Sequence, residues 1–341
     1  MNYKTFYSLK LSEIGLGTYL GNPDKETDTS YYNTIKKAIS FGVNVIDTAI
    51  NYRNMRSERV IGEVLYQVER DNLVISTKGG YIPVDSDYAK NPQEWFRREL
   101  LDSGILSKSD ITPYGNVLTP KYISWSFNRS LKNLKTSYID VYFIHNPEDQ
   151  LQFLSREVFY ERLKSVFSFL EEKVQEGKLK FYGLATWNGF RVPESNKQFL
   201  DLPYIVNLAN EVAGDNHHFR FIQLPYNLAM PEAYFLKNQS INGEKMSTLE
   251  ASEKLGIYTY ISAPLLQGRL LSNLPEALKD ILKVPKENLI PIQFVRSTPG
   301  VGTVLIGMSK EEHLKQNLEI ENYEKVSKET IETLIKNLKT G

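Results

Sequence analysis

Short apolar runs alternate with longer amphipathic segments along the chain, and this alternation limits the possible folds more than any other feature of the sequence. The runs are rich in β-branched residues and predict eight strands, at residues 13–19, 43–49, 72–78, 138–145, 180–186, 219–225, 256–262 and 303–307. The longer segments predict helices at 29–40, 57–69, 119–134 and 156–176, near 194–210, 247–255 and 288–298, and twice at the carboxyl terminus. Strands that alternate with helices form a parallel sheet. Eight such units fit a closed (β/α)8 TIM barrel better than an open doubly wound sheet, so the predicted fold class is an α/β barrel.

The length of 341 residues allows two domains of about 150 residues, or one barrel of about 250 residues with insertions. We predict a single barrel domain over residues 1–341. Its largest insertion, residues 79–118, follows the third predicted strand and contains several aromatic and proline residues. We expect this insert to cover the active face as a substrate lid, the alternative being a segment that only stabilises the fold. Residues 226–247, which are polar and rich in asparagine, predict a second long loop.

The composition excludes several classes of function. The 41 basic and 41 acidic residues balance, which argues against a nucleic-acid partner, because such binding needs a surplus of Lys and Arg. The chain has no cysteine, and therefore no disulfide, thiol nucleophile or thiolate metal site. His217 and His218 are adjacent and would point apart on a strand, so no metal site is predicted. The chain lacks a secretory signal and any apolar stretch approaching about 18 residues, and we expect a soluble cytoplasmic protein without membrane contact.

Polar residues lie at the carboxyl ends of three predicted strands, which is where a barrel of this class carries its chemistry. Asp47, Lys78 and His145 lie at or near the ends of the second, third and fourth predicted strands, and Tyr52 follows Asp47 by five residues. Each residue alone has an ordinary structural explanation, such as a helix cap or a packing aromatic. Together they predict acid catalysis at a carbonyl group.

The chemistry of acid catalysis accounts for each of these residue types. A phenol has a pKa near ~10, and a neighbouring Lys78 ammonium is expected to lower the pKa of Tyr52 and make it a better proton donor. Asp47 would hold Lys78 in place, and His145 would orient or polarise the carbonyl oxygen. None of these groups supplies a reducing equivalent, so a hydride carrier must bind beside them.

Segments along nearly the whole chain resemble the aldo-keto reductases, a (β/α)8-barrel family that binds a nicotinamide cofactor without a Rossmann domain. The similar segments include GVNVIDTAINYR (42–53), LVISTK (73–78), SLKNLKTSYIDVYFIHNP (130–147), EGKLKFYGLAT (176–186), IQLPYNL (222–228) and IGMSKEEHLKQNL (306–318). The resemblance implies that Tyr52 is the proton donor and that Lys78 and Asp47 tune it. It also implies that His145 orients the carbonyl group.

The resemblance implies a set of cofactor contacts as well. The nicotinamide is expected beside Thr18, Asp47, Thr186, Gln223 and Ser262, and the pyrophosphate and adenosine beside Leu265, Gln267, Arg269, Ser309, Lys310, His313, Gln316 and Asn317. The last five belong to a helix that we expect to begin at Ser309, where free N–H groups would suit a phosphate. The pattern departs from the family at His313, where relatives carry Arg, and at Ala185 and Thr186, where they carry Ser-Asn. NADP(H) is the favoured cofactor, because Ser309, Lys310 and His313 could meet a 2′-phosphate. NAD(H) is the alternative, because His313 carries less charge at pH 7 than the usual Arg.

We expect an NAD(P)H-dependent aldo-keto reductase that interconverts an aldehyde or ketone with an alcohol, and whose partners are small molecules. One alternative is a non-catalytic nicotinamide-binding regulatory subunit on the same fold, as in the family's potassium-channel auxiliary subunits. Another is an NAD-dependent sugar or polyol dehydrogenase. Asn146 stands where many relatives have Trp and implies a more polar pocket wall, whereas Trp187 is expected to pack without contacting substrate. The sequence indicates neither the physiological substrate nor the oligomeric state.

Overall fold

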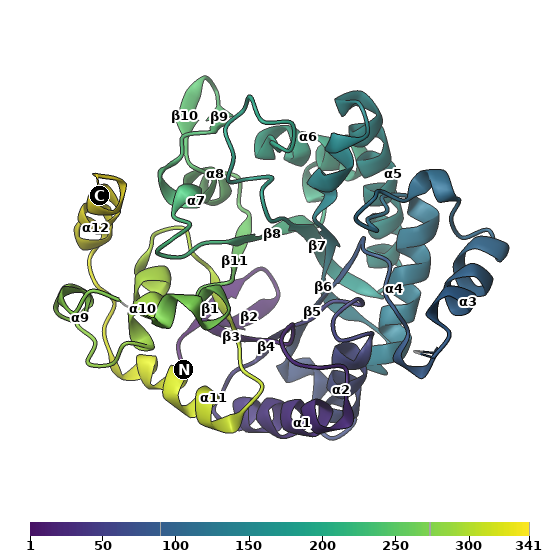
Figure 1. Ribbon diagram of the computed structural model, residues 1–341. Helices are drawn as coiled ribbons and strands as arrows, with labels where there is room; N and C mark the ends of the chain where they lie inside the picture. Colours follow the sequence, from purple (N-terminus) through teal and green to yellow (C-terminus); the bar gives the residue numbers. More distant parts are fainter. Residues whose placement is uncertain (89, 273, 341) are drawn as a thin grey trace.

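Eight parallel strands form a closed barrel, and the helices are arranged around it (Figure 1). The computed structural model describes residues 1–88, 90–272 and 274–340, with side chains to residue 337. The barrel strands are β3 (Ile14–Gly17), β4 (Val45–Asp47), β5 (Val74–Gly79), β6 (Ile139–His145), β7 (Leu179–Ala185), β8 (Phe219–Pro225), β11 (Tyr258–Ser262) and β12 (Thr303–Gly307). The last strand, β12, pairs in parallel with β3 and closes the barrel. The predicted parallel barrel is therefore confirmed.

The outer helices follow the predicted segments, with differences at their ends. They are α1 (Lys25–Ser40), α2 (Arg56–Leu65), α4 (Pro120–Leu134), α5 (Arg156–Gln175), α6 (Leu202–Ala213), α8 (Thr248–Lys254), α10 (Leu289–Ser297), α11 (Glu311–Leu318) and α12 (Lys328–Thr340), with a short α9 (Ala277–Leu282) before α10. The prediction of a helix from about residue 194 is wrong, because α6 begins only at Leu202. The Asp201 side chain accepts a hydrogen bond from the backbone N–H of Tyr204, and Pro203 lies in the first turn.

The barrel interior has its own apolar core, separate from the layer between strands and helices. Phe143, Phe221 and Tyr260 belong to it, and all three are fully buried. The strands β1 (Tyr3–Phe6) and β2 (Leu9–Ser12) form an antiparallel hairpin, which was not predicted from the sequence. Leu9 and Leu11 of this hairpin belong to the interior core. The strands are buried on both faces, as parallel strands usually are.

The helical part of the insert at residues 79–118 lies outside the barrel, where Trp95 packs against Trp125 of α4 (Figure 1). It contains α3 (Pro92–Phe96), a π-helical turn (Arg97–Asp102) and two short 3₁₀ turns. A bridge between Tyr81 and Asn116 joins its two ends, and Trp95 is buried among the helices. The expected role of the insert as a lid stays a prediction.

The second long connection contains regular secondary structure, whereas a plain loop was expected from the sequence. Residues 226–247 contain α7 (Glu232–Phe235) and a hairpin of β9 (Gln239–Ile241) and β10 (Glu244–Met246). The two residues of the turn, Asn242 and Gly243, have φ angles of 51° and 82°. Asn-Gly is a strong signal for a two-residue hairpin turn, so the prediction of a plain loop is wrong here.

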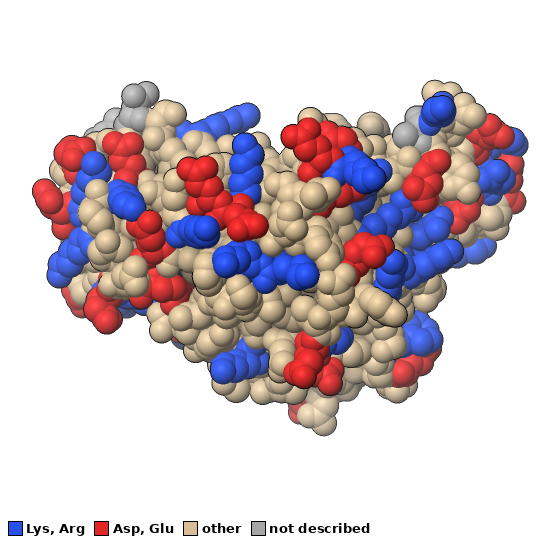
Figure 2. Space-filling view, turned by 90° about the horizontal axis from the view of Figure 1, so that it is seen from below, with Lys and Arg blue, Asp and Glu red and all other residues tan. Residues whose placement is uncertain are grey.

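Acidic and basic side chains lie interspersed on the face of the molecule shown in Figure 2, in keeping with the balanced composition. Among the described residues, no helix combines the length and apolar character that crossing a membrane requires. Across the same residues, no group of three or more His, Asp or Glu side chains is placed to hold a metal ion.

Candidate active site

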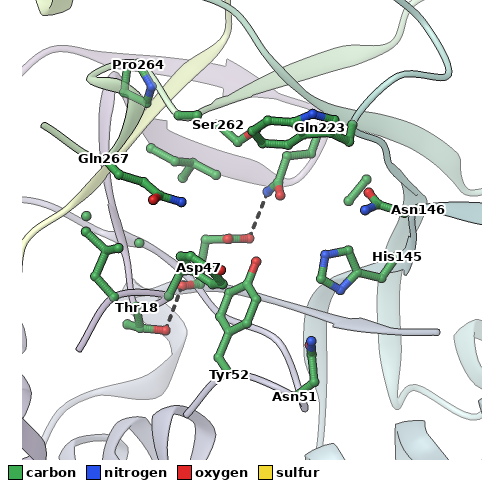
Figure 3. A pocket seen from close by; sticks show the side chains of 18 of the residues that line it. Thr18, Asp47, Asn51, Tyr52, His145, Asn146, Gln223, Ser262, Pro264 and Gln267 are labelled. Carbon is green, nitrogen blue, oxygen red and sulfur yellow. Dashed lines mark hydrogen bonds between the residues drawn. The ribbon is translucent and has the colours of Figure 1, made fainter. Parts of the chain in front are cut away.

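A cavity of about 430 Å³ opens at the carboxyl ends of the barrel strands. Seven of the eight barrel strands contribute a residue to its wall, and Tyr81, two residues after β5, completes the ring. This is the position expected for chemistry in this fold. Tyr52, His145 and Gln223 point into the cavity from different elements, and Asp47 lies between them (Figure 3). The four residues of the expected catalytic tetrad, Asp47, Tyr52, Lys78 and His145, meet at this one place.

Asp47 and Lys78 form the buried ionic centre of the site. Lys78 Nζ donates to Asp47 Oδ2 at 2.6 Å and to the backbone carbonyl of Thr48 at 2.7 Å. Ser76 Oγ and Gln223 Nε2 donate to the other carboxylate oxygen of Asp47, at 2.7 and 3.0 Å. The Lys78 side chain is 0% exposed. Burial opposes its charge, but the neighbouring Asp47 and Tyr52 outweigh burial and raise the pKa of Lys78, so it stays an ammonium ion.

Tyr52 lies directly over this ammonium group. Lys78 Nζ is 4.8 Å from the centre of the Tyr52 ring. Burial raises the pKa of Tyr52 above its usual value, and the charge of Lys78 opposes this shift without overcoming it. The expectation of a lowered pKa for Tyr52 is wrong in its net direction, because the loss of solvent around the phenolate exceeds the attraction of one ammonium ion.

His145 is held as a neutral imidazole. Burial and the nearby Lys78 charge place its pKa well below the usual value. The Tyr52 and His145 rings lie edge to face with centres 6.0 Å apart, and the Tyr81 ring contacts His145 at 4.9 Å. In the part of the chain that the structure describes, Nδ1 of His145 has no hydrogen-bond partner. The neutral imidazole therefore packs against the Tyr52 and Tyr81 rings and forms part of the cavity wall.

Seven of the expected cofactor residues line the cavity. They are Thr18, Asp47, Thr186, Gln223, Ser262, Leu265 and Gln267. Thr186 Oγ1 is buried and lacks a hydrogen-bond partner among the described residues, which suits a polar ligand in the cavity. Thr18 Oγ1 and the side chain of Gln223 are engaged with Asp47, so these contacts would have to be shared or exchanged on binding (Figure 3).

The other expected cofactor residues do not line the cavity: Arg269, Ser309, Lys310, His313, Gln316 and Asn317. The helix α11 begins at Glu311 and not at Ser309, because Ser30 and Thr34 of α1 donate hydrogen bonds to the Ser309 carbonyl and Lys310 has an extended backbone. Its first turn carries Glu311 and Glu312, which weakens the attraction of this helix end for a phosphate.

A model of the Aldo/keto reductase family matches residues 13–338 of the chain. The chain belongs to the aldo/keto reductase family. An uncharacterized oxidoreductase of Bacillus subtilis is 22% identical over 96% of this chain and 92% of its own length. A putative voltage-gated potassium channel subunit beta of Schizosaccharomyces pombe is 22% identical over 96% of this chain and 89% of its own length. An aldo/keto reductase from Klebsiella pneumoniae, solved in complex with NADP and acetate, has a similar fold, with a TM-score of 0.65 and 20% identity over 96% of this chain and 92% of that one.

The structure adds wall residues to this aldo/keto reductase site that sequence reasoning did not assign. Asn51, Tyr81 and Trp187 line the cavity, as does Asn146, whose polar contribution was expected. Trp187 is 43% exposed at the cavity wall and is therefore not an interior packing residue, whereas the expectation that it does not contact substrate stays a prediction. Tyr81 and Trp187 each follow a barrel strand by two residues, so the rule that directed attention to the strand ends could have found them.

Proposed function

We propose that this chain is an NAD(P)H-dependent aldo/keto reductase that reduces an aldehyde or ketone to an alcohol, with Tyr52 as the general acid. One observation carries the proposal: a fully buried Lys78 ammonium, fixed by Asp47, lies against the Tyr52 phenol in a cavity shared with a neutral His145. Residues of these types in this arrangement suit the delivery of a proton to a carbonyl oxygen.

Tyr52 delivers the proton in this mechanism. The raised pKa keeps the phenol protonated at neutral pH, which is the form that an acid needs. Lys78 has three N–H donors, of which the Asp47 carboxylate and the Thr48 carbonyl accept two. The remaining donor and the positive charge stabilise the phenolate oxygen as the proton leaves. Asp47 keeps the ammonium group in this position, and neutral His145 donates a hydrogen bond that orients the substrate oxygen.

The family implies a nicotinamide cofactor. The cavity suits such a cofactor, because its wall presents two polar groups, the unpartnered hydroxyl of Thr186 and the side-chain amide of Gln223. When bound, such a cofactor supplies the hydride. Thr18, Ser262, Leu265 and Gln267 would line its site. Arg269 and the residues around the start of α11, which lie outside the cavity wall, stay the proposed contacts for the phosphates. NADP(H) is favoured because the Klebsiella pneumoniae relative was solved with NADP. NAD(H) remains the alternative, since His313 is a weaker partner for a 2′-phosphate than Arg.

A non-catalytic nicotinamide-binding regulatory subunit is the second candidate. It is favoured by the Schizosaccharomyces pombe relative, whose name gives it as a putative voltage-gated potassium channel subunit. The two proposals differ in turnover: a regulatory subunit would bind NADPH without oxidising it in the presence of any carbonyl compound.

The test is the Tyr52→Phe variant, measured by NADPH and NADH oxidation with methylglyoxal and 4-nitrobenzaldehyde. We expect the wild-type protein to turn over and the variant to lose roughly 10²- to 10⁴-fold in kcat, the usual contribution of a general acid. The Kd for cofactor should change by less than about twofold, because the ring remains. Tyr66→Phe, at an exposed position of 87% relative accessibility, is the control and should behave as wild type. Unchanged kcat in Tyr52→Phe would overturn the mechanism, and a wild-type protein that binds NADPH without turnover would favour the regulatory subunit.

A further inference from the structure

The turn that follows Tyr52 has an unusual backbone. Arg53, Asn54 and Met55 are three consecutive residues with left-handed φ angles of 50°, 58° and 66°, and none of them is glycine. This conformation costs an L-residue roughly 1–2 kcal/mol. Strained backbone of this kind persists only where the surrounding structure holds it, and it is found preferentially at functional sites.

Contacts on one side of the turn hold Arg53. Its side chain is 1% exposed and reaches the loop before α1, where Nε donates to the Asn22 carbonyl at 2.9 Å and Nη2 to the Asp24 carbonyl at 3.2 Å. Nη2 also donates to Asp28 Oδ1 at 2.6 Å. Arg56, one residue beyond the turn, pairs with the other oxygen of the same carboxylate. Asp28 therefore fixes both ends of the turn to α1.

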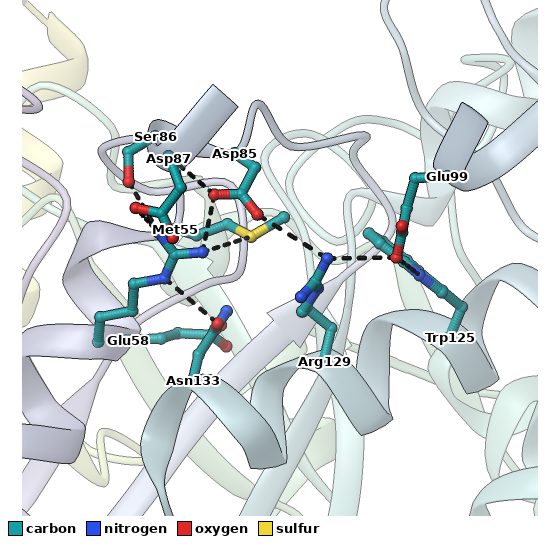
Figure 4. A network of polar contacts seen from close by, with 10 residues as sticks. Met55, Glu58, Asp85, Ser86, Asp87, Glu99, Trp125, Arg129 and Asn133 are labelled. Carbon is teal, nitrogen blue, oxygen red and sulfur yellow. Dashed lines mark hydrogen bonds and ion pairs between the residues drawn. The ribbon is translucent and has the colours of Figure 1, made fainter. Parts of the chain in front are cut away.

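Contacts on the other side come from the insert. The backbone N–H of Ser86 donates to the Asn54 carbonyl at 3.2 Å, in the middle of the turn. Arg59 of α2 donates to Ser86 Oγ at 2.8 Å and pairs with Asp85 Oδ1 at 2.7 Å. Met55 is fully buried, and its sulfur lies beside the Arg59 guanidinium. Figure 4 shows Met55 beside Asp85 and Ser86 in this network.

Asp85 is the centre of this second anchor. Its side chain is 2% exposed, and its other oxygen lies 3.8 Å from Arg129 of α4, which in turn pairs with Glu99 of the insert (Figure 4). Two guanidinium groups from two different helices thus converge on one buried carboxylate. Removing one partner of a buried ion pair leaves an uncompensated buried charge, which strongly destabilises the folded state.

We propose that Asp28 and Asp85 are positioning residues that clamp the turn of residues 53–55 from two sides and so fix the Tyr52 hydroxyl relative to Lys78. The insert then acts as a brace for the proton donor, whether or not it also covers the cavity. This inference rests on the proposed function, because it assigns a purpose to the position of Tyr52.

The test uses Asp28→Asn and Asp85→Asn in the full-length protein, with kinetics and amide hydrogen exchange. We expect each variant to lose roughly 10- to 100-fold in kcat, the size of effect that a displacement of about 1 Å produces. The KM for the carbonyl and the Kd for NADPH should change by less than about threefold. The alkaline limb of the kcat–pH profile should move to higher pH, because a displaced Tyr52 loses the stabilisation that Lys78 gives its phenolate. The amides of Tyr52, Arg56 and Ser86, which donate to the carbonyls of Ala49, Arg53 and Asn54, should exchange about tenfold faster.

Asp102→Asn is the matched control. Asp102 also lies in the insert and pairs with an arginine, Arg97, at 2.6 Å, but both side chains are more than half exposed. It should leave kcat, the pH profile and the exchange of the Tyr52, Arg56 and Ser86 amides unchanged. If Asp85→Asn does not fold, Asp28→Asn and Arg53→Lys carry the same expectation.

The outcomes separate the inference from the function on which it rests. Variants with wild-type kcat and wild-type exchange at Tyr52, Arg56 and Ser86, beside an active wild-type protein, would overturn the clamp and leave the proposed function standing. If the wild-type protein shows no turnover, but the amides of Tyr52, Arg56 and Ser86 still exchange faster in both variants, the proposed function is refuted and the clamp stands.

Discussion

Glu148, three residues after His145, shows how burial acts on a single ionisable group near the cavity. Its Oε1 accepts hydrogen bonds from the backbone N–H groups of Trp187, Asn188 and Gly189 at 2.7, 2.9 and 3.2 Å. Burial raises the pKa of Glu148 from 4.5 to about 7 in spite of these contacts. Between those two pH values the folded protein binds more protons than the unfolded chain, so stability falls as the pH rises and levels off above about pH 7.

We expect Glu148→Gln to remove this pH dependence, because the amide does not titrate. The free energy of unfolding of the wild-type protein, measured by urea denaturation relative to the variant, should fall by on the order of 2 kcal/mol between pH 5 and pH 7. Glu176→Gln serves as the control. Hydrogen bonds from Lys173 and Lys178 lower the pKa of this exposed carboxyl, so its linkage lies below pH 4.5. Parallel pH curves for the wild-type protein and Glu148→Gln would contradict the assignment.

At the scale of one element, helix α4 has Lys135 as its C-cap, a residue that suits the left-handed backbone conformation of this position poorly. Lys135 has φ 50° and ψ 41°, and the backbone N–H of Thr136 donates to the Leu131 carbonyl at 3.3 Å. This geometry is the one for which glycine is preferred at a helix terminus. We expect Lys135→Gly to raise the free energy of unfolding by about 0.5–1 kcal/mol. Its ion pair with Glu63 is half exposed on both sides and adds little.

Lys132→Gly is the opposite case in the same helix and should lower the free energy of unfolding by about 1 kcal/mol, because Lys132 lies within the last helical turn. Thermal and urea unfolding of the two variants would show the contrast. Equal destabilisation by both would mean that the left-handed position does not limit the stability of α4.

At the scale of the whole molecule, the packing inside the closed barrel leaves the buried hydroxyl of Tyr260 without a hydrogen-bond partner among the described residues. Tyr260 lies among the aromatic rings of the interior, 5.8 Å from Phe143 and 5.5 Å from Phe221 between ring centres. We expect Tyr260→Phe to keep the free energy of unfolding or raise it by up to about 1 kcal/mol, because an unsatisfied buried hydroxyl is unfavourable.

Tyr226 gives the comparison outside the barrel interior. Its hydroxyl lies 3.1 Å from Thr298 Oγ1, and Tyr226→Phe should lower the free energy of unfolding by about 1 kcal/mol. Urea denaturation of both variants measures the difference. A larger loss in Tyr260→Phe than in Tyr226→Phe would show that the interior hydroxyl has a partner.

The sequence by itself determined the parts of this protein that depend on local pattern. The period of apolar residues identified the eight barrel strands, and the position of Asp47, Lys78 and His145 near strand ends followed from it. The Asn242–Gly243 pair is an equally local signal, from which the β9–β10 hairpin could have been predicted. Local signals suffice in such cases because a strand or a turn is formed by neighbours in the chain.

The tertiary structure alone decided which distant residues meet and how far each is removed from water. Gln223 contacts Asp47 across 176 positions, and Ser86 of the insert holds the turn after Tyr52. The pKa of Tyr52 rises because the desolvation of its phenol sums over everything packed around it, and that sum exceeds the one charge that sequence reasoning could see. The order of residues along the chain determines which side chain each strand or helix carries. The closing of the barrel determines which distant groups surround that side chain and how far it is removed from water.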